Sequence, residues 1–479
     1  MKNIILCGYP NNVETAQLID SLTNNFINVR AVITSDENSY SPIGIEYISH
    51  STISNRYSKI NFQEEDYSAL GFLSDKYSFI MRCMSRWDES ITNNDDRLFM
   101  IDSIYLYFIM LLRNEKIQLV FYGTGTPHHF YNLLLSLSAK YLNISNVYPI
   151  NNWINNRVRF VLEDYNHTIP IKGFGDDDGK MSKYLENICF SSQILTSQAQ
   201  RVFSDKTTSN YLIFLFTILL PQILGRIKFI LSNGKDLYLK NSNGKISRVF
   251  AYVIHIMNSQ IFKLRFRKKY FKYTDKKARP CNSIILYAMN QPEATSHPDG
   301  GFYPDYRYWV FFLKKFGKPI YYKEHKANFI HHTDKDIVDT YKHRSLYYLD
   351  FFIKNRVSLI SESYSTTQLL ADCNDIFTLS GSVILESTLR GKTVYYPGIP
   401  FHGDLPGVET VISNNYIKLK KTSILSYEEV VNHFNILESY SIPNYGAFST
   451  SVKENVNYKI CLEHIGNVLL WVFQNKNNN

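Results

Sequence analysis

The stretch from Cys281 to Tyr303, CNSIILYAMNQPEATSHPDGGFY, constrains the fold of this chain more than any other. It opens with an apolar run, Ile284 to Met289, which predicts a strand buried on both faces of a parallel sheet. Two prolines and two glycines follow, so the chain has to leave this strand as a loop. Open α/β sheets bind ligands where loops leave the carboxyl ends of their strands. Glu293 in this loop is therefore the first carboxylate that we expect to carry chemistry.

Two more predicted strands end in polar residues further along the chain. The segment Pro319 to His325 predicts a strand that ends in Lys323, Glu324 and His325. Lysine and histidine side chains at such a position can bind a phosphate and neutralise its charge. The segment Asp375 to Arg390 predicts a strand, a tight turn and a helix in immediate succession.

The turn in this last segment consists of Ser380, Gly381 and Ser382. Backbone N–H groups at a helix N-terminus, with hydroxyls beside them, form an anion site, although a simple helix cap has the same sequence. Glu386 lies one turn further along, where it either accepts hydrogen bonds from ribose hydroxyls or is a surface glutamate. The three strand exits together supply the groups that a sugar nucleotide requires.

The order of these motifs resembles that of a known family. QPEAT with a Pro-x-Gly-Gly turn is followed by YxKEH, by SGSxxxE and by GKTVYYPGIPF at Gly391 to Phe401. This order is similar to that of the capsular polysaccharide and surface-carbohydrate glycosyltransferases, which are related to the retaining Kdo and nonulosonate transferases of bacterial capsule assembly. The resemblance spans Ile284 to Phe401. One departure is Lys326, which stands where family members usually have proline after KEH.

The resemblance implies a fold and a reaction. The fold is α/β with GT-B architecture: two Rossmann-like, doubly wound domains face a cleft, with the acceptor bound by the first domain and the nucleotide sugar by the second. The reaction is transfer of Kdo, or of a nonulosonate such as pseudaminic acid, from a CMP-activated donor to a glycan or lipid-linked glycan, with retention. No metal or other cofactor is required. A UDP- or GDP-hexose donor is one alternative, and a non-catalytic carbohydrate-binding or assembly protein of a capsule complex is another.

Each motif residue receives an expected role from this resemblance. Glu293 acts either as nucleophile, which gives retention, or as general base, which gives inversion. Lys323 and His325 neutralise the departing phosphate. The donor's phosphate or sugar carboxylate binds at the Ser-Gly-Ser turn, and its ribose binds Glu386. Three further polar residues are expected to support the catalytic loop: Gln291, Thr295 and Ser296.

The length of 479 residues predicts two domains with connecting elements. We expect a Rossmann-like acceptor domain at 1–203, a basic helical linker at 204–280, a donor domain at 281–454, and a C-terminal helix at 455–479 that crosses back to the first domain. The β-α-β opening at Lys2 to Thr34 lacks GxGxxG, which argues against a dinucleotide site. A further strand is predicted at Tyr77 to Arg82.

Two polar clusters in the first half could also carry function. His128 and His129 follow the predicted strand Ile117 to Tyr122; the resemblance assigns them to the acceptor, whereas packing against the next helix is an equally simple role. Asp176 to Asp178 could hold a divalent metal against a diphosphate. A solvated polar loop between glycines is the favoured interpretation of these aspartates, so no metal site is expected.

Basic residues are concentrated in one segment. The chain carries a net charge of +9, and Arg226 to Arg279 contains fifteen Lys and Arg against two Asp, a local balance of +13. Beside the apolar run Tyr211 to Leu224, this charge favours an amphipathic element on an anionic membrane surface over a solvated linker or a nucleic-acid site. The run of 14 residues is too short to span a bilayer.

The N-terminus and the cysteines indicate a compartment. The chain enters its first predicted strand almost at once, without the pattern of a secretory signal. Six cysteines are scattered without CxxC pairs, which is typical of free thiols in a reducing environment. We therefore expect a cytoplasmic protein on the inner face of the cytoplasmic membrane.

Overall fold

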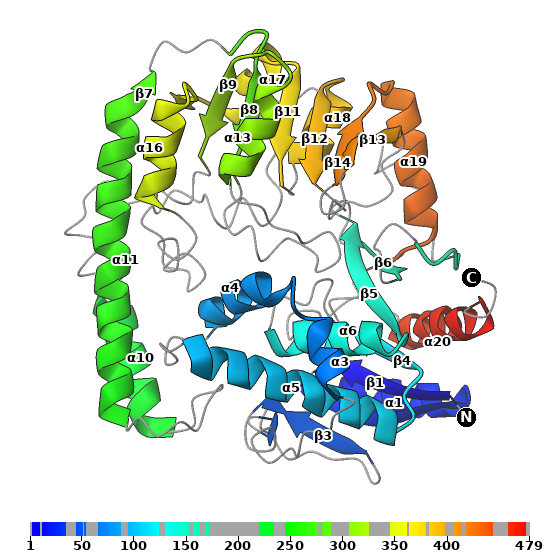
Figure 1. Ribbon diagram of the computed structural model, residues 1–479. Helices are drawn as coiled ribbons and strands as arrows, with labels where there is room; N and C mark the ends of the chain where they lie inside the picture. Colours follow the sequence, from blue (N-terminus) through cyan, green and yellow to red (C-terminus); the bar gives the residue numbers. More distant parts are fainter. Residues whose placement is uncertain are drawn as a thin grey trace.

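The computed structural model describes the chain in separate segments. These are residues 2–9, 12–34, 45–50, 52–53, 66–87, 94–123, 130–152, 157–162, 168–172, 220–233, 245–275, 280–288, 306–324, 345–361, 364–379, 383–397, 407–413, 418–443 and 458–475. Within them the chain forms two mainly parallel sheets with helices packed on both (Figure 1). This confirms the predicted α/β class.

The first sheet has the strand order β15-β6-β5-β4-β1-β2-β3. Its strands are β1 (Lys2–Cys7), β2 (Ile27–Thr34), β3 (Glu46–Ser49), β4 (Leu119–Tyr122), β5 (Ser145–Asn152), β6 (Arg157–Val161) and β15 (Ile442–Pro443). The pairs from β3 to β5 are parallel, and β6 and β15 add antiparallel strands at one edge. The strand order reverses between β1 and β4, as in a doubly wound sheet.

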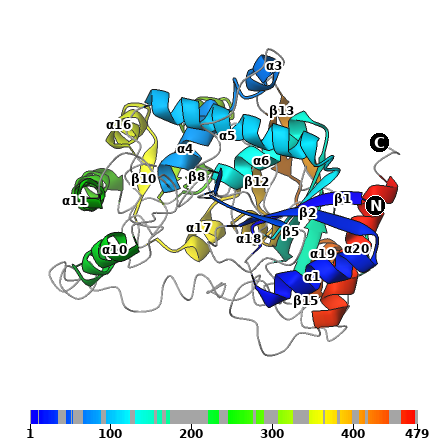
Figure 2. The same cartoon turned by 90° about the horizontal axis from the view of Figure 1, so that it is seen from below.

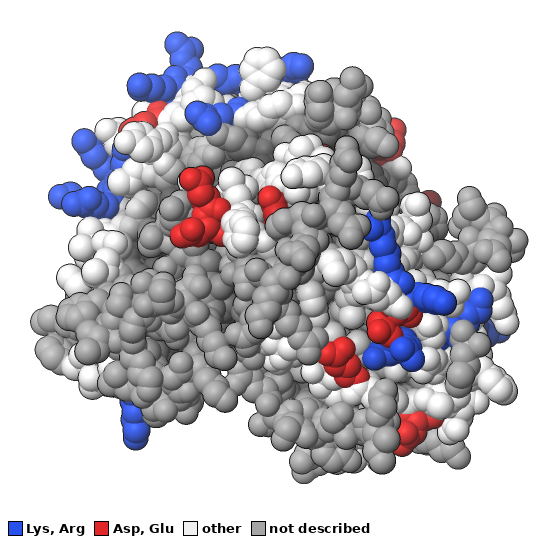
Figure 3. Space-filling view, turned by 60° about the horizontal axis from the view of Figure 1, so that its bottom comes forward, with Lys and Arg blue, Asp and Glu red and all other residues white. Residues whose placement is uncertain are grey.

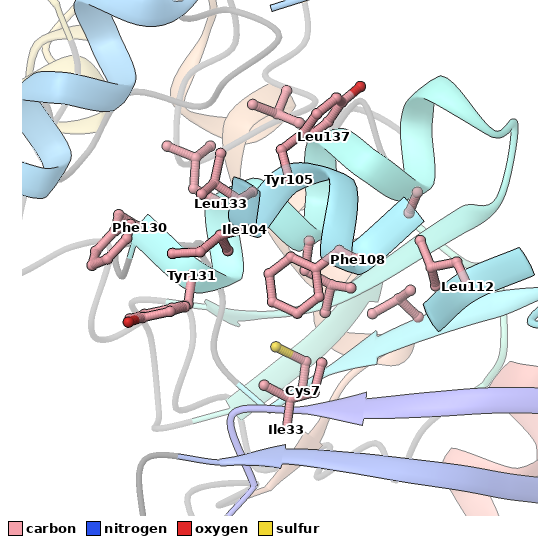
Figure 4. Packing of buried hydrophobic residues seen from close by; sticks show 14 of the residues in the cluster. Cys7, Ile33, Ile104, Tyr105, Phe108, Leu112, Phe130, Tyr131, Leu133 and Leu137 are labelled. Carbon is pink, nitrogen blue, oxygen red and sulfur yellow. The ribbon is translucent and has the colours of Figure 1, made fainter. Parts of the chain in front are cut away.

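Helices cover both faces of this sheet because β1 is apolar on both. Ile5 and Cys7 point into one core, and Ile4 and Leu6 into the other, which is the two-residue period of a strand. The helices are α1 (Val13–Asn24), α3 (Asp66–Gly71), α4 (Tyr77–Trp87), α5 (Asn94–Asn114), α6 (Phe130–Tyr141) and α20 (Tyr458–Asn475). Figure 4 shows the first core, where Phe108 of α5 packs toward the sheet.

The strand predicted at Tyr77 to Arg82 is wrong, because this segment forms α4. Its buried residues are Phe79, Ile80, Cys83 and Met84. Their spacing of one, three and one residues places them on one face of a helix rather than on alternate faces of a strand. The apolar period, rather than the β-forming residue types, therefore decides the structure here.

The second sheet has the strand order β13-β14-β12-β11-β8-β9-β10-β7. Its strands are β7 (Thr274–Asp275), β8 (Ile284–Tyr287), β9 (Ile320–Lys323), β10 (Ser358–Ile360), β11 (Asp375–Thr378), β12 (Thr393–Pro397), β13 (Val408–Ser413) and β14 (Lys418–Thr422). All pairs from β7 to β12 are parallel, and β14 pairs antiparallel with β12 and β13. The strand order reverses between β8 and β11.

Apolar residues also bury β8 on both faces. Ile284 and Leu286 belong to one core and Ile285 to another, and none of the three is exposed. Among the described residues, the helices that follow β8 in this half are α13 (Tyr306–Lys314), α16 (Leu346–Lys354), α17 (Thr366–Asp372), α18 (Val383–Leu389) and α19 (Tyr427–Ser439). A continuous apolar run therefore forms the central strand of the second sheet, as the sequence predicts.

The predicted basic linker contains α10 (Leu220–Asn233) and α11 (Lys245–Tyr273). The C-terminal half of α11 is part of the second sheet's core through Phe266 and Tyr270, and the chain continues directly into β7. The Tyr270 hydroxyl lies 2.7 Å from the Ile360 carbonyl oxygen and 3.3 Å from that of Tyr322. Helix α11 is thus anchored to β9 and β10.

The chain returns to the first sheet near its C-terminal end. Strand β15 pairs with β6, and α20 contacts α1 (Figure 2). Ile442 already belongs to the first sheet, whereas the predicted returning segment begins at residue 455. The described part of the chain contains no helix that is both long and apolar enough to cross a membrane.

We predict that Tyr270→Phe lowers the free energy of unfolding by about 1 to 3 kcal/mol, because buried carbonyls of the second sheet lose a donor. Urea denaturation followed by circular dichroism measures this change. Tyr273→Phe is the matched control, since Tyr273 lies on the same helix and is 43% exposed. A Tyr270→Phe protein as stable as this control would contradict the anchoring role.

A second prediction concerns His464 of α20, which is 4% exposed and packs 6.1 Å from the Phe160 ring. Burial lowers the pKa of His464 to about 4. In the unfolded chain this histidine has its ordinary pKa of about 6.5, so between pH 6.5 and pH 4 it is protonated in the unfolded chain and neutral in the folded chain. The free energy of unfolding therefore falls as the pH is lowered through this window. His464→Phe should therefore lose about 2 kcal/mol less stability than the wild type between pH 7 and pH 5. Equal losses in denaturation series at the two pH values would contradict the assignment.

Candidate active site

The carboxyl ends of three neighbouring strands meet in the middle of the second sheet. Tyr287, the last residue of β8, is in register with Lys323 at the end of β9 on one side and with Thr378 at the end of β11 on the other. Strand order reverses between β8 and β11, and open α/β sheets bind their ligands at such a point. This edge, defined by Tyr287, Lys323 and Thr378, is the candidate site edge.

Most of the predicted site residues lie outside the described residues. The loop with Glu293 follows β8, His325 follows β9, and the Ser-Gly-Ser turn follows β11. The full set outside the described residues is Gln291, Glu293, Thr295, Ser296, His325, Ser380, Gly381, Ser382, His128, His129 and Asp176 to Asp178. Their roles stay predictions, and the structure describes two of the predicted residues, Lys323 and Glu386.

Lys323 is buried at the candidate site edge with 5% of its surface exposed. Its Nζ donates a hydrogen bond of 2.8 Å to the Ser361 carbonyl oxygen, which directly follows β10. This hydrogen bond links the ends of β9 and β10. The ammonium group of Lys323 is therefore held in one position at the candidate site edge, whereas the ammonium group of an exposed lysine moves freely.

The neighbouring carboxylate of Glu324 is also buried, with 1% of its surface exposed. It accepts a hydrogen bond of 2.7 Å from the Tyr322 hydroxyl, and its backbone N–H lies 3.4 Å from the Tyr270 hydroxyl. A buried carboxylate requires such donors, because an unpartnered one is costly to remove from water. The KEH motif thus combines a buried cation and a buried carboxylate at the end of β9.

Glu386 lies in the first turn of α18 and is half-buried. The pKa of the Tyr287 hydroxyl is raised to about 12, chiefly by burial and in addition by the negative charge of Glu386, while the hydrogen bond between Tyr287 and Thr366 acts in the opposite direction. The two hydroxyl oxygens of Tyr287 and Thr366 are 2.9 Å apart. The structure therefore brings Glu386 close to the candidate site edge.

Tyr287 and Thr366 are residues that sequence reasoning missed. Tyr287 stands within the apolar run Ile284 to Met289, which predicts a buried strand, and none of the motifs in the sequence includes Thr366. Thr366 begins helix α17, which has a capping box formed by Ser365 and Gln368. The sequence does offer one indication of a role for Tyr287, namely its position. It is the last residue of its strand, so its hydroxyl lies near the edge of the sheet.

The first sheet has an equivalent reversal between β1 and β4. The Gly123 N–H donates to the Cys7 carbonyl oxygen at 2.8 Å, and a Cβ atom at Gly123 would lie 3.1 Å from the Gly8 carbonyl oxygen. Gly8 has a φ of 78°, which favours glycine. The segment that leads from β4 to His128 and His129 therefore begins where the strand order of the first sheet reverses.

Metal ligands are not assembled in the described residues. No group of three or more His, Cys, Asp or Glu side chains there could hold an ion. Asp176 to Asp178 lie outside these segments, so the interpretation of that motif stays a prediction.

We predict that the Tyr287 and Thr366 hydroxyls stabilise the site edge together. Tyr287→Phe and Thr366→Val should each lower the free energy of unfolding by about 1 kcal/mol. The double variant should lose less than the sum, with a coupling of about 0.5 kcal/mol or more, because both changes remove one interaction. Thr23→Val in α1, combined with Tyr287→Phe, is the additive control. Additivity in both pairs would disprove the contact.

Comparisons with known proteins do not assign a family. No family model matches the chain, and no curated protein matches it. A UDP-GlcNAc 2-epimerase from Methanocaldococcus jannaschii aligns with 98% of this chain and 100% of its own, at 11% identity and a TM-score of 0.20. One from Neisseria meningitidis bound to UDP-GlcNAc aligns over the same shares, at 14% identity and a TM-score of 0.19. A glycosyltransferase from Rickettsia africae aligns with 98% of both chains, at 11% identity and a TM-score of 0.20. Likeness at this level establishes neither a shared fold nor a shared activity.

Proposed function

We propose that this chain is a glycosyltransferase of GT-B architecture that binds its nucleotide-sugar donor at the candidate site edge. The observation that carries the proposal is the register of β8 with β9 and β11. The three segments that resemble the capsular polysaccharide transferases leave the sheet from these adjacent strands. Motifs that are separated by 30 to 90 residues in the sequence therefore start from one edge of one sheet.

The proposed donor site uses charge rather than a metal. A departing phosphate requires positive charge or hydrogen-bond donors as its own charge develops. Lys323 supplies a fixed ammonium at the end of β9, and its bond to the Ser361 carbonyl keeps that ammonium in place. His325 and the Ser-Gly-Ser turn complete the phosphate site, and Glu386 binds the ribose.

Glu293 is the proposed catalytic residue, and two roles remain open for it. As a nucleophile, its carboxylate forms a bond to the anomeric carbon as the donor phosphate leaves, and the acceptor hydroxyl then displaces Glu293 with overall retention. As a general base, it takes the proton of the acceptor hydroxyl during one inverting displacement. The relation to the Kdo transferases favours retention.

The proposed donor is a CMP-activated ulosonic acid, and the acceptor is a glycan or lipid-linked glycan of a bacterial capsule. Resemblance of the motifs supports this choice, since anion-binding groups suit both the phosphate and the sugar carboxylate. A UDP- or GDP-hexose is the alternative donor for the same sheet edge. A carbohydrate-binding protein without catalytic activity is the alternative from another class.

A thermal-shift panel of CMP, UDP and GDP without added metal tests the donor site. The correct nucleotide at a hundredfold excess over its Kd should stabilise the protein by about 2.7 kcal/mol. We expect CMP to stabilise it most, and His325→Ala to weaken that effect. Equal stabilisation of the variant would remove His325 from the site, whereas an absolute requirement for Mn²⁺ would support a metal at Asp176 to Asp178. No stabilisation by any nucleotide would contradict the proposal.

Glu293→Gln tests the enzyme itself. The amide keeps the size of the side chain and removes its basicity and nucleophilicity, so turnover should fall about 10² to 10⁴-fold while nucleotide binding and the melting temperature stay unchanged. Glu463→Gln, an exposed position on α20, is the matched control. The anomeric configuration of the product distinguishes nucleophile from base. Undiminished turnover of Glu293→Gln would exclude both roles.

A further inference from the structure

Helices α10 and α11 lie side by side along one edge of the molecule (Figures 1 and 2). Together they contain ten Lys and Arg and no Asp or Glu. From Phe262 onward, α11 contributes to the core of the second sheet and contacts α16. Among the described residues, the earlier part of α11 supplies no member of the hydrophobic cores.

Large apolar side chains between Ile254 and Leu264 are exposed on one face of α11. Their positions follow a spacing of three, four and three residues, which places them in a single stripe. The stripe consists of Ile254, Met257, Ile261 and Leu264, with exposed fractions of 55%, 56%, 44% and 46%. On the neighbouring α10, Leu220 and Leu224 are 42% and 56% exposed.

Cations continue the same face toward the C-terminal end of α11. Arg265, Lys268 and Lys272 are exposed and lie three and four residues apart, in line with the apolar stripe. Another cation, Lys269, points toward the protein body, where it forms a 2.6 Å ion pair with Asp350 of α16. Figure 3 shows Lys and Arg side chains gathered at the upper left, on the side where Figure 1 places α11.

The charge pattern distinguishes between two possible occupants of this face. A heptad-like apolar stripe also suits pairing with a second copy of the helix. Two copies would, however, bring together two basic faces, each with Arg265, Lys268 and Lys272, and α11 carries no Asp or Glu to offset them; like charges across an interface are unfavourable. An anionic lipid surface offers both an apolar layer for the stripe and negative charge for the cations.

We infer that the apolar-basic face of α11, formed by Ile254, Met257, Ile261, Leu264, Arg265, Lys268 and Lys272, docks on an anionic membrane surface. The helix lies in the plane of the interface, its apolar side chains reach the boundary between headgroups and acyl chains, and its cations lie among the lipid phosphates. The sequence predicts membrane attraction for the basic segment Arg226 to Arg279, and the inference assigns it to this face of α11. The inference does not depend on the glycosyltransferase proposal.

Co-sedimentation of the full chain with vesicles tests the inference. Vesicles of phosphatidylcholine alone are compared with vesicles that contain phosphatidylglycerol, at low and high salt. Binding should require the anionic lipid and weaken with salt through screening. The triple variant Arg265→Gln, Lys268→Gln and Lys272→Gln should bind about a hundredfold more weakly, given the usual contribution of each cation near such a surface.

A second variant and a matched control separate docking from charge alone. Ile261→Gln with Leu264→Gln changes two exposed side chains, so folding is preserved while binding to anionic vesicles falls at least tenfold. The control replaces three exposed cations elsewhere, Arg113, Lys116 and Lys315, by Gln and should bind like the wild type.

Three outcomes would overturn the inference. The first is the absence of co-sedimentation with anionic vesicles at low salt, and the second is equal loss of binding in the control and in the triple variant. The third is a dimer in sedimentation velocity without lipid that Ile261→Gln with Leu264→Gln abolishes, because a second copy would then cover the stripe. Nucleotide stabilisation should be the same in all these variants, so failure of membrane docking is distinguishable from failure of the proposed function.

Discussion

The parallel pairing of β8 with β9 and β11 is the interaction on which the rest of the structure and its proposed function depend. Ile284 and Ile285 are fully buried on opposite faces of β8, so the strand is fixed in the centre of the sheet. Adjacent strands are about 4.8 Å apart, so the ends of β9 and β11 are separated by about 10 Å. One nucleotide sugar is long enough to contact both exits. The sheet therefore brings the ends of these three strands together at the candidate site edge.

Helix α11 connects this edge to the surface of the molecule. Its Tyr270 hydroxyl bonds to the end of β10, next to the Ser361 carbonyl that accepts from Lys323. The same helix carries the exposed stripe and the basic residues that we propose to dock on lipid. One continuous helix thus joins the proposed membrane-docking face to the candidate site edge, and docking through that face would orient the edge relative to the bilayer.

The sequence predicts the central strands and the candidate edge well, and the contacts between distant residues poorly. Strand β9 (Ile320–Lys323) lies within the segment Pro319 to His325 that predicts it, because a short apolar run between turns leaves few alternatives. The error at Tyr77 came from weighing residue type above the helical period. The hydrogen bond that holds Lys323 could not be predicted, because its partner Ser361 lies 38 positions away in the chain. The same is true of the contact of Tyr287 with Thr366, which lies 79 positions away. Such contacts follow from tertiary packing and leave no local pattern.

Hydrogen–deuterium exchange with and without a saturating nucleotide tests the central claim most directly. The account predicts slower exchange in peptides that cover 284–305 and 375–390, the exits of β8 and β11, because a ligand at the strand reversal shields the backbone there. Peptides that cover the exits of β1 and β4 in the first sheet should exchange at unchanged rates. Protection confined to those first-sheet exits, or unchanged exchange throughout the chain, would contradict the assignment of the donor site to the second sheet.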